Sequence, residues 1–346
     1  MVSASAPSLP WLREPLQAAL AATREHHLLL VHGPQGVGQF ELALSLAQAW
    51  LCEAGAAEAR PCGHCASCRL VLSHNHPDLL VLLPEVLQEP LGWAPAASEE
   101  GATVKPDRKP SKEIKVDAAR QAVAFAQLSC ARGRAKVVVI HPAERLNAVA
   151  ANTLLKTLEE PPGRARFVLA SGAPEALPAT VRSRCQALHL ALPGAAQAEH
   201  WLAGQGVAGA AVLLAASGGQ PQTAKAWADE GKDAAAWAEL PTRVARGDAG
   251  GLPAWPVPRA IDALLKLCHD ALLASLGGRP RYFPAVPAAP ALAPLQAWQA
   301  ALIEAARYAD HPVNAALLVE SLVMQGRRAL LPREPADAPS LHSRHE

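Results

Sequence analysis

The sequence predicts an α/β domain built on a parallel β-sheet, followed by an all-helical region. In the first part of the chain, short uninterrupted apolar runs alternate with helical patterns, which is typical of strands buried on both faces of a parallel sheet. After Pro193 the strand-like runs cease and only helical periodicity continues. The 346 residues are enough for two or three domains. Half of them are hydrophobic, which is enough for a sizeable core.

Four apolar runs are clear strand candidates, and a fifth is weaker. Each run is short and rich in Leu and Val, and the first leads directly into a glycine-rich turn. We expect strands at Leu28–Val31, Leu79–Leu83, Val137–Ile140 and Phe167–Ala170, with the weaker fifth at Leu188–Leu190.

The expected helices have recognisable starts and stops. Asn147 is a candidate N-cap, and Pro161 and Pro162 end the helix that follows it. Another helix begins near Asp117, and Gly218-Gly219 separates two short helices in the later region. The helix after Asn147 places these apolar residues on one face: Ala150, Leu154, Leu155 and Leu158.

Two segments are expected to lack regular structure. Residues 84–112 are rich in Pro, Ala and charge without clear periodicity, which predicts a long surface loop. The polar residues 334–346 predict a disordered tail.

Composition excludes several classes of protein. The net charge is only +1, which argues against strong autonomous DNA binding because such proteins usually carry a basic stripe. No run reaches about 18 uncharged apolar residues, so no membrane span is expected. The first residues show no basic and apolar regions of a secretory signal, so we expect a cytoplasmic protein whose thiols stay reduced.

Four of the seven cysteines are clustered in the run CEAGAAEARPCGHCASC. Cys62, Cys65 and Cys68 form a CxxCxxC pattern, and Cys52 lies at the end of the preceding helix. Four thiolates in a tetrahedron are a typical set of ligands for structural zinc, and no open coordination position is implied. The sequence therefore predicts a structural zinc module over residues 52–68.

Other interpretations of the cysteine cluster are weaker. A bacterial iron–sulfur run needs a fourth cysteine at position 72, which is Leu72. His64, His74 and His76 are alternative ligands, although four cysteines suffice. The remaining Cys130 and Cys268 lie in helical patterns and are expected in the core.

The turn after the first strand resembles a phosphate-binding loop that has lost its functional side chains. The run GPQGVGQF has the context of G-x-x-x-x-G-K-[ST], between a strand and a helix. The lysine position is Gln39 and the Ser/Thr position is Phe40, so the phosphate-binding charge and the Mg²⁺-binding hydroxyl are missing. The glycines that remain are Gly33, Gly36 and Gly38.

The second half of an ATPase site is also incomplete. The third strand should end in Asp-Glu to hold Mg²⁺ and activate water, but it ends in His141-Pro142. Glu144 lies about one helical turn further along and is expected to point elsewhere. We therefore expect no ATP hydrolysis by this chain, while nucleotide binding without turnover stays open.

Several motifs resemble the AAA+ subunits of the bacterial DNA polymerase III clamp loader. They are NTLLKTLEEPP at residues 152–162, TVRSRC at residues 180–185, HPD at residues 76–78 and the inserted cysteine module. The degenerate phosphate loop makes the chain similar to the delta-prime members of that family rather than to the ATP-hydrolysing tau/gamma members. The resemblance covers residues 25–193 strongly and the helical remainder weakly, ending with residues 311–325, which resemble the family's last collar helix.

The resemblance implies a domain organisation and a set of partners. It implies an AAA+/RecA-like parallel-sheet domain at 1–193, a small helical lid at 194–236 and a helical collar at 237–333. It also implies a hetero-pentamer with tau/gamma and delta subunits, which acts on the sliding clamp and primer-template DNA. The chain would bind zinc but no ATP, and would not be an enzyme on its own.

The resemblance further implies a role for Ser183, Arg184 and Cys185. In the family, this Ser-Arg-Cys motif reaches into the ATP site of the neighbouring subunit, so Arg184 is the candidate trans-acting arginine finger. A guanidinium is always charged and offers a planar fork of donors that suits a γ-phosphate. Arg182 is the weaker candidate, and the run at residues 218–224 lacks the sensor arginine of the ATPase members.

Two other functions compete with this interpretation. One is a tau/gamma-type ATPase that uses Gln39 in an unusual way, and the missing Lys, Ser/Thr, Asp and Glu side chains argue against it. The other is a zinc-dependent DNA-binding protein, which the near-neutral charge disfavours because duplex binding depends on phosphate neutralisation.

Overall fold

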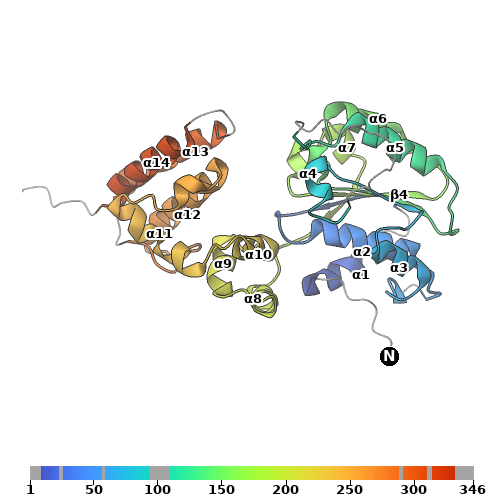
Figure 1. The fold of residues 1–346 in the computed structure, drawn as a ribbon, viewed down its shortest axis with the longest axis horizontal. Helices are drawn as coiled ribbons and strands as arrows, with labels where there is room; N and C mark the ends of the chain where they lie inside the picture. The colour runs from blue at the N-terminus through green and yellow to red at the C-terminus, as the bar shows by residue number, and fades with distance from the viewer. Residues whose placement is uncertain are drawn as a thin grey trace, which may run out of the picture. The chain divides into compact units, whose positions relative to one another are not determined.

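The fold is described from a computed structural model of the chain (Figure 1). It describes residues 9–22, 26–56, 59–93, 109–287, 291–309 and 314–331. The chain forms two compact units, residues 1–197 and 198–346.

The first unit contains a five-stranded parallel sheet in the order β2-β3-β4-β1-β5. All five expected strands are present, so the predicted α/β class with a parallel sheet is confirmed. The weaker fifth begins two residues before its expected start and forms an edge of the sheet. The strands are β1 (Leu28–His32), β2 (Leu79–Leu82), β3 (Lys136–Ile140), β4 (Ala165–Ser171) and β5 (Gln186–His189).

Helices cover both faces of this sheet. Figure 1 shows α2 and α3 on one side of it and α5 and α6 on the other. The helices are α1 (Arg13–Ala22), α2 (Gln39–Leu51), α3 (Ala66–Leu72), α4 (Glu85–Gln88), α5 (Val116–Gln127), α6 (Ala148–Glu159) and α7 (Ala179–Arg182). Among the described residues of this unit, 3₁₀ turns lie before α1 at η1 (Pro10–Leu12), after β3 at η3 (Ala143–Arg145) and after β4 at η4 (Pro174–Ala176).

Burial on both faces explains why these strands are apolar without alternation. Every residue of β3 is buried, and Leu28 and Leu30 of β1 belong to a core with α5 and α6. Because successive side chains of a strand point to opposite faces, Leu29 and Val31 are buried on the face that α2 covers. A parallel sheet of this kind needs crossover helices, which close both layers.

The predicted limits of α6 are confirmed, whereas one cysteine assignment is wrong. The Asn147 side chain accepts a hydrogen bond from the backbone N–H of Ala150, as expected of an N-cap. Cys268 is buried in a helix, but Cys130 lies three residues beyond the end of α5 in a half-buried turn. The helical periodicity before Cys130 did not show that Leu128 already has extended backbone.

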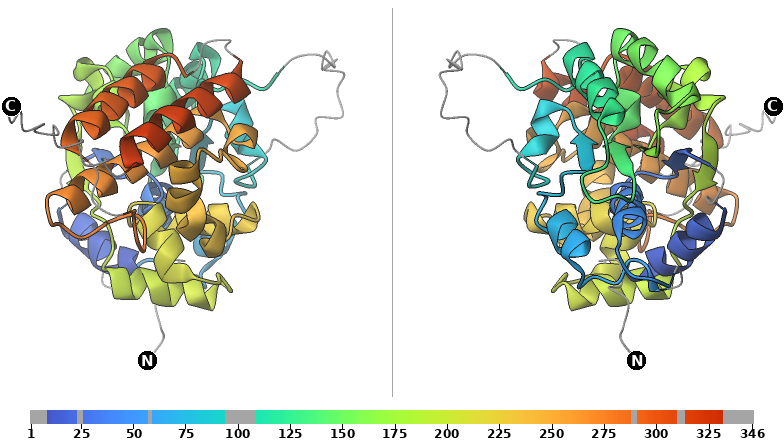
Figure 2. Two further views of the ribbon diagram at one scale, coloured as in Figure 1. Left: turned by 90° about the vertical axis from the view of Figure 1, so that its left-hand side faces the viewer. Right: turned by 90° about the vertical axis from the view of Figure 1, so that its right-hand side faces the viewer.

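The second unit is helical, and the break at Gly218-Gly219 separates α9 from α10 as predicted. Helices α13 and α14 contact each other along their lengths (Figure 2). The elements are α8 (Ala195–Gly204), which spans the unit boundary, α9 (Ala210–Ala216), α10 (Pro221–Asp229), α11 (Ala234–Arg246), η5 (Leu252–Ala254), α12 (Val257–Ser275), α13 (Leu292–Arg307) and α14 (Ala315–Leu330).

Two polar anchors fix the core of α11–α14. Trp298 is buried, and its indole N–H donates to the carbonyl of Leu322, which joins α13 to α14. The fully buried Asp270 of α12 accepts hydrogen bonds from the backbone N–H groups of residues 281–283. These bonds satisfy groups that would otherwise be costly to bury.

The two segments expected to be irregular are only partly described. Helix α4 and the turns that follow it occupy residues 85–92, so the first part of the predicted loop has regular structure. Residues 94–108 and the predicted tail lie outside the described residues. In the described part of the chain, no helix combines the length and apolar character needed to cross a membrane.

Candidate functional site

The phosphate-loop sequence forms the turn between β1 and α2. Gly36 and Gly38 have positive φ angles of 74° and 103°, which residues with a Cβ rarely adopt. The loop therefore has the strand–glycine turn–helix context in which backbone N–H groups bind phosphates. Whether a phosphate can enter depends on the side chains that surround it.

The Gln39 side chain is directed into its own loop. Its Nε2 donates to the carbonyl oxygens of Gly33 (2.9 Å) and Pro34 (2.6 Å), and the residue is 5% exposed. A lysine at this position would present a positive charge to the β- and γ-phosphates. The neutral glutamine amide instead satisfies the loop's own carbonyl groups and holds the loop closed.

The segment before α1 packs against the other side of the loop. The Trp11 indole N–H donates to the carbonyl of Val37 at 2.8 Å. A Cβ placed on Gly38 would lie 2.6 Å from the Leu9 side chain, which is closer than packed atoms come, and 3.2 Å from the Leu12 side chain, which is a tight contact. These apolar contacts fill the space beside the N-terminus of α2.

The strand end that would hold magnesium is occupied by a stacked aromatic pair. Phe40 is 7% exposed, and its ring stacks on His141 with the centroids 4.7 Å apart. Burial lowers the pKa of His141, which favours the neutral imidazole. Glu144 turns toward β4, where its carboxylate accepts from the backbone N–H of Gly172. In the described part of the chain, no carboxylate therefore takes the place of an ATPase's Asp-Glu pair at the end of β3.

Arg184 lies on the surface between α7 and β5. Its Nη1 donates to the carbonyl of Thr180 at 2.6 Å, and its Nε forms an ion pair with Glu159 at the end of α6. The side chain remains 38% exposed. The structure thus brings together the two sequence motifs LEEPP and SRC, a contact that the sequence analysis did not predict.

The neighbours of Arg184 fix the backbone of this turn. The Ser183 hydroxyl donates to the Thr180 carbonyl at 3.4 Å, and the Cys185 thiol lies 3.2 Å from the Val181 carbonyl. Burial raises the pKa of Cys185 to about 12, so it is an unreactive neutral thiol. Arg182 is also exposed and donates to the Pro174 carbonyl. The turn therefore leaves both arginines accessible, and among the ion pairs of the described residues Arg184 has one, with Glu159.

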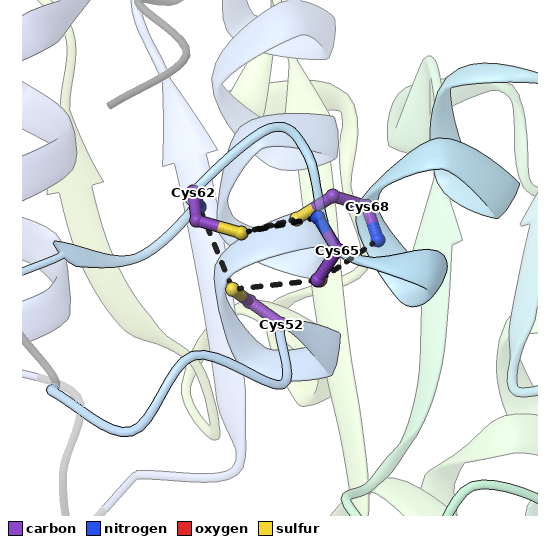
Figure 3. Close-up of side chains that lie close together, drawn as sticks. All are labelled: Cys52, Cys62, Cys65 and Cys68. Atoms are coloured by element: carbon purple, nitrogen blue, oxygen red, sulfur yellow. Dashed lines mark hydrogen bonds between the residues drawn. The ribbon is translucent and has the colours of Figure 1, made fainter. Parts of the chain in front are cut away.

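The four clustered cysteines meet as the sequence predicts (Figure 3). Their Sγ atoms all lie within 4.8 Å of one another, with Cys62–Cys68 at 3.9 Å and Cys52–Cys65 at 4.0 Å. Zinc–sulfur bonds of about 2.3 Å place the sulfurs of a tetrahedron about 3.8 Å apart. The geometry of the four thiols therefore fits a single tetrahedral metal ion.

Backbone N–H groups also point at these sulfurs. Cys52 Sγ accepts from Ala54 and Cys62, and Cys65 Sγ accepts from Cys68. Burial raises the pKa of Cys52. Burial acts in the same direction on Cys62, but the N–H groups of His64 and Cys65 outweigh it and lower its pKa to about 6. A bound cation favours the thiolate form at all four positions.

The candidate histidine ligands lie apart from the four thiols. His64 Nδ1 bonds to the Cys62 carbonyl, and His74 bonds to the Gly92 carbonyl and stacks on Trp93. His76 is buried, with Nε2 bonded to the Ser67 hydroxyl at 3.0 Å. The metal group found among the described residues therefore consists of cysteines alone.

Residues 10–193, more than half of the chain, match the family model described as DNA polymerase III, delta subunit. The chain belongs to this family. Its curated relatives include subunit delta' of Pseudomonas aeruginosa, 37% identical over 62% of this chain and 60% of the relative. Subunit tau of Escherichia coli is 35% identical over 54% of this chain and 25% of the relative.

The match therefore spans about 60% of the length of the delta' relative. Among solved structures, the chain is similar to a gamma subunit-related protein of DNA polymerase III from Thermotoga maritima. That structure is 15% identical with a TM-score of 0.47, covering 92% of this chain and all of the other. The resemblance predicted from the motifs is confirmed by the family match.

In this delta-family chain, the HPD motif anchors the cysteine module to the sheet. Asp78 is fully buried and accepts from the backbone N–H groups of Ala131 and Arg132 at 2.8 and 2.9 Å. It also forms a buried ion pair with Lys136 of β3 at 2.9 Å. The motif predicts the family from sequence, but its structural role depends on a loop that is 53 residues away from Asp78 along the chain.

A second set of contacts continues from this anchor to the module. Arg132 forms an ion pair with Glu53 at 2.6 Å and donates to the Ser67 hydroxyl, which also bonds to His76. Glu53 directly follows Cys52, and Ser67 directly precedes Cys68. The polar network therefore connects both ends of the cysteine module to the loop before β3.

We predict that Asp78→Asn destabilises the protein by about 3 kcal/mol at pH 7, because it removes the carboxylate that neutralises the buried Lys136 charge. The Lys136 ion pair and backbone donors outweigh burial and lower the pKa of Asp78. A carboxyl group whose pKa is lower in the folded protein stabilises the fold at pH values above its unfolded-state pKa of about 3.9. That stabilisation is lost as the pH falls through the folded-state pKa. The difference between variant and parent should therefore shrink below about pH 4.

Urea unfolding followed by circular dichroism at several pH values measures this difference. Asp117→Asn is the matched control, because Asp117 pairs with Arg120 on the surface and is 85% exposed. An equal and small loss in the two variants at pH 7 would contradict the assigned role of Asp78.

Proposed function

We propose that this chain is a non-hydrolysing delta-prime-type subunit of a DNA polymerase III clamp loader. It supplies Arg184 to the ATP site of a neighbouring subunit and has no working ATP site of its own. The observation that carries this proposal is the contrast between a phosphate loop closed by Gln39 and an arginine held at the surface.

The closed loop supports the absence of hydrolysis. Phosphoryl transfer depends on a positive charge at the phosphates, a held Mg²⁺ and a positioned water. Gln39 and Phe40 replace the first two groups, and His141 lies where a carboxylate is needed. The tau/gamma-type ATPase alternative would require ligands that this end of the sheet lacks among the described residues.

We predict that the chain does not bind ATP with Mg²⁺ in an isothermal titration, because Gln39 offers no positive charge to the phosphates and Phe40 offers no hydroxyl to Mg²⁺. The double variant Gln39→Lys/Phe40→Thr restores the charge and the hydroxyl and should gain measurable ATP affinity. Phe40→Thr alone is the control and should gain none. Saturable binding of one ATP by the parent protein would contradict the proposed empty site.

The contacts of Arg184 support its action on a neighbour. The Thr180 carbonyl and Glu159 hold the guanidinium in one orientation, which reduces the rotamer entropy lost on binding. Exposed ion pairs are worth about 0–1 kcal/mol, so Glu159 can yield the guanidinium to a phosphate with little cost. An arginine supplied in trans accelerates phosphoryl transfer by roughly 10³–10⁵ in other enzymes.

We predict that Arg184→Ala leaves the reconstituted loader assembled and lowers its DNA- and clamp-stimulated ATP turnover by at least about tenfold. The physical reason is the loss of a positive charge at the neighbour's γ-phosphate. Arg182→Ala is the matched control, because it removes an adjacent exposed arginine and should change turnover less than twofold. Unchanged ATP turnover in the Arg184→Ala variant would contradict the assignment of Arg184 as the trans-acting arginine finger.

The partners and domain roles form part of the same proposal. The family membership supports assembly with tau/gamma and delta subunits and, through them, contact with the sliding clamp and primer-template DNA. We assign residues 194–236 to a lid and 237–333 to a collar that joins the subunits. The complex would act in the cytoplasm, and the chain alone would not be an enzyme.

The metal at the four cysteines is proposed to be zinc. Four closely spaced thiols with backbone N–H donors fit a closed structural site. Bound zinc supplies a cross-link between the end of α2 and the start of α3. The network through Glu53, Arg132 and Asp78 then fixes this cross-linked module to the sheet.

We predict close to one equivalent of zinc in protein purified under reducing conditions, measured by atomic emission. Cys62→Ser should lower it below half an equivalent because it removes one of four ligands. Cys130→Ser is the control, since Cys130 lies outside the cluster, and should retain the metal. A parent protein with less than half an equivalent of zinc would overturn the assignment.

A further inference from the structure

The carboxylate that pairs with Arg184 lies where helices ordinarily avoid negative charge. Glu159 is the last residue of α6 and Glu160 is its C-cap, so two carboxylates lie at the negative end of the helix dipole. A carboxylate at this end destabilises a helix unless a cation offsets its charge. Local rules of this kind are broken mainly at functional sites.

Arg184 is the cation that offsets Glu159. The ion pairs of the described residues join Glu159 to no other basic side chain, including Lys156 of the same helical turn. Glu160 is also exposed, and within the described part of the chain it forms no ion pair. The two adjacent carboxylates therefore differ chiefly in their contact with the proposed finger.

The Glu159 carboxylate occupies a donor that a phosphate would use. A guanidinium binds a phosphate most strongly through two parallel N–H groups, either Nε with Nη2 or Nη1 with Nη2. Glu159 accepts from Nε of Arg184 and the Thr180 carbonyl accepts from Nη1, so each of these edges already has one acceptor. Glu159 also places a negative charge where a triphosphate would approach, and like charges repel each other.

The ion pair can open without a change in the backbone. The backbone N–H of Arg184 donates to the carbonyl of Val181 at 3.2 Å, which fixes the turn. Pro161 restricts the backbone directly after the C-cap of α6. The Arg184 and Glu159 side chains are 38% and 43% exposed, so rotation of the arginine side chain alone can separate them.

We propose that the Glu159–Arg184 ion pair is an autoinhibitory contact, in which Glu159 competes with the γ-phosphate of the neighbouring subunit's ATP for one guanidinium. This inference rests on the proposed role of Arg184 and adds its regulation. In the absence of the neighbour's ATP, the carboxylate binds Arg184. When Mg²⁺ and ATP bind, the more highly charged γ-phosphate replaces the carboxylate, so the ion pair sets the ATP concentration at which the finger engages.

A positioning role for Glu159 predicts a different result. If the carboxylate had to remain on Nε during phosphoryl transfer, its removal would lower turnover at saturating ATP. Exchange is favoured by the exposure of the pair, because exposed ion pairs are weak and hydrogen bonds from arginine to phosphate are strong.

The test measures how DNA- and clamp-stimulated turnover of the reconstituted loader depends on ATP concentration. Glu159→Gln removes the charge and keeps the shape of the side chain. It should lower the ATP concentration of half-maximal turnover by about two- to fivefold, because an exposed ion pair contributes little free energy. Maximal turnover should stay within about twofold of the parent value. Glu160→Gln is the matched control and should change neither quantity.

Combining the variants separates failure of this inference from failure of the proposed function. With Arg184→Ala already present, Glu159→Gln should have no further effect, because the guanidinium for which the two anions compete is gone. If Arg184→Ala alone leaves turnover unchanged, the finger assignment fails and this inference fails with it. If Arg184→Ala lowers turnover but Glu159→Gln does not lower the half-maximal ATP concentration, only the autoinhibitory contact is overturned. A fall in maximal turnover alone would make Glu159 a positioning residue and also overturns the proposal.

A measurement on the isolated chain tests the contact without ATP. In protein labelled with ¹⁵N-arginine, Arg184→Ala identifies the Nε–H signal of Arg184. Glu159→Gln should shift this signal and speed its exchange with water, because Nε loses its carboxylate acceptor, whereas Glu160→Gln should leave it unchanged. A signal that is the same in the parent and in the Glu159→Gln variant overturns the proposal.

Discussion

The parallel arrangement of the five strands is the constraint on which the first unit depends. It requires crossover helices on both faces, so the central strands β1, β3 and β4 are apolar along most of their length. It also brings the carboxyl ends of β1, β3 and β4 to one edge of the sheet. That edge is the ordinary place for phosphate chemistry, yet here Gln39 closes the loop, Phe40 stacks on His141 and Glu144 supports the backbone at Gly172. Polar and charged groups that an ATPase would direct at a ligand are directed at the protein itself.

The buried Asp78–Lys136 pair extends this constraint to the cysteine module. A buried ion pair is stable only when hydrogen bonds satisfy the remaining polar atoms, and the N–H groups of Ala131 and Arg132 do this. Arg132 then connects the pair to Glu53 and Ser67, which lie next to two of the four clustered thiols. The cysteine module is therefore an integral part of the α/β unit, and its orientation follows that of β2 and β3.

The contacts around Arg184 are exposed to solvent, unlike those of the phosphate loop. The residues that end α6 and those that precede β5 meet through the Glu159–Arg184 ion pair, which is half exposed and therefore weak and exchangeable. Buried interactions hold the phosphate loop, whereas accessible ones hold the proposed finger.

The sequence by itself determined the fold class, the five strands, the cap of α6 and the four cysteines, because hydrophobic periodicity, capping residues and ligand spacing are local properties. It also showed that Lys, Ser/Thr and the acidic pair are missing from the phosphate site. Only the tertiary structure decided that Gln39 bonds back to Gly33, that Glu159 meets Arg184 and that Asp78 binds a loop more than 50 residues away. Such contacts depend on which strands and helices become neighbours. Local sequence patterns do not specify which strands and helices become neighbours. For the same reason the prediction that Cys130 lies in a helical core was wrong.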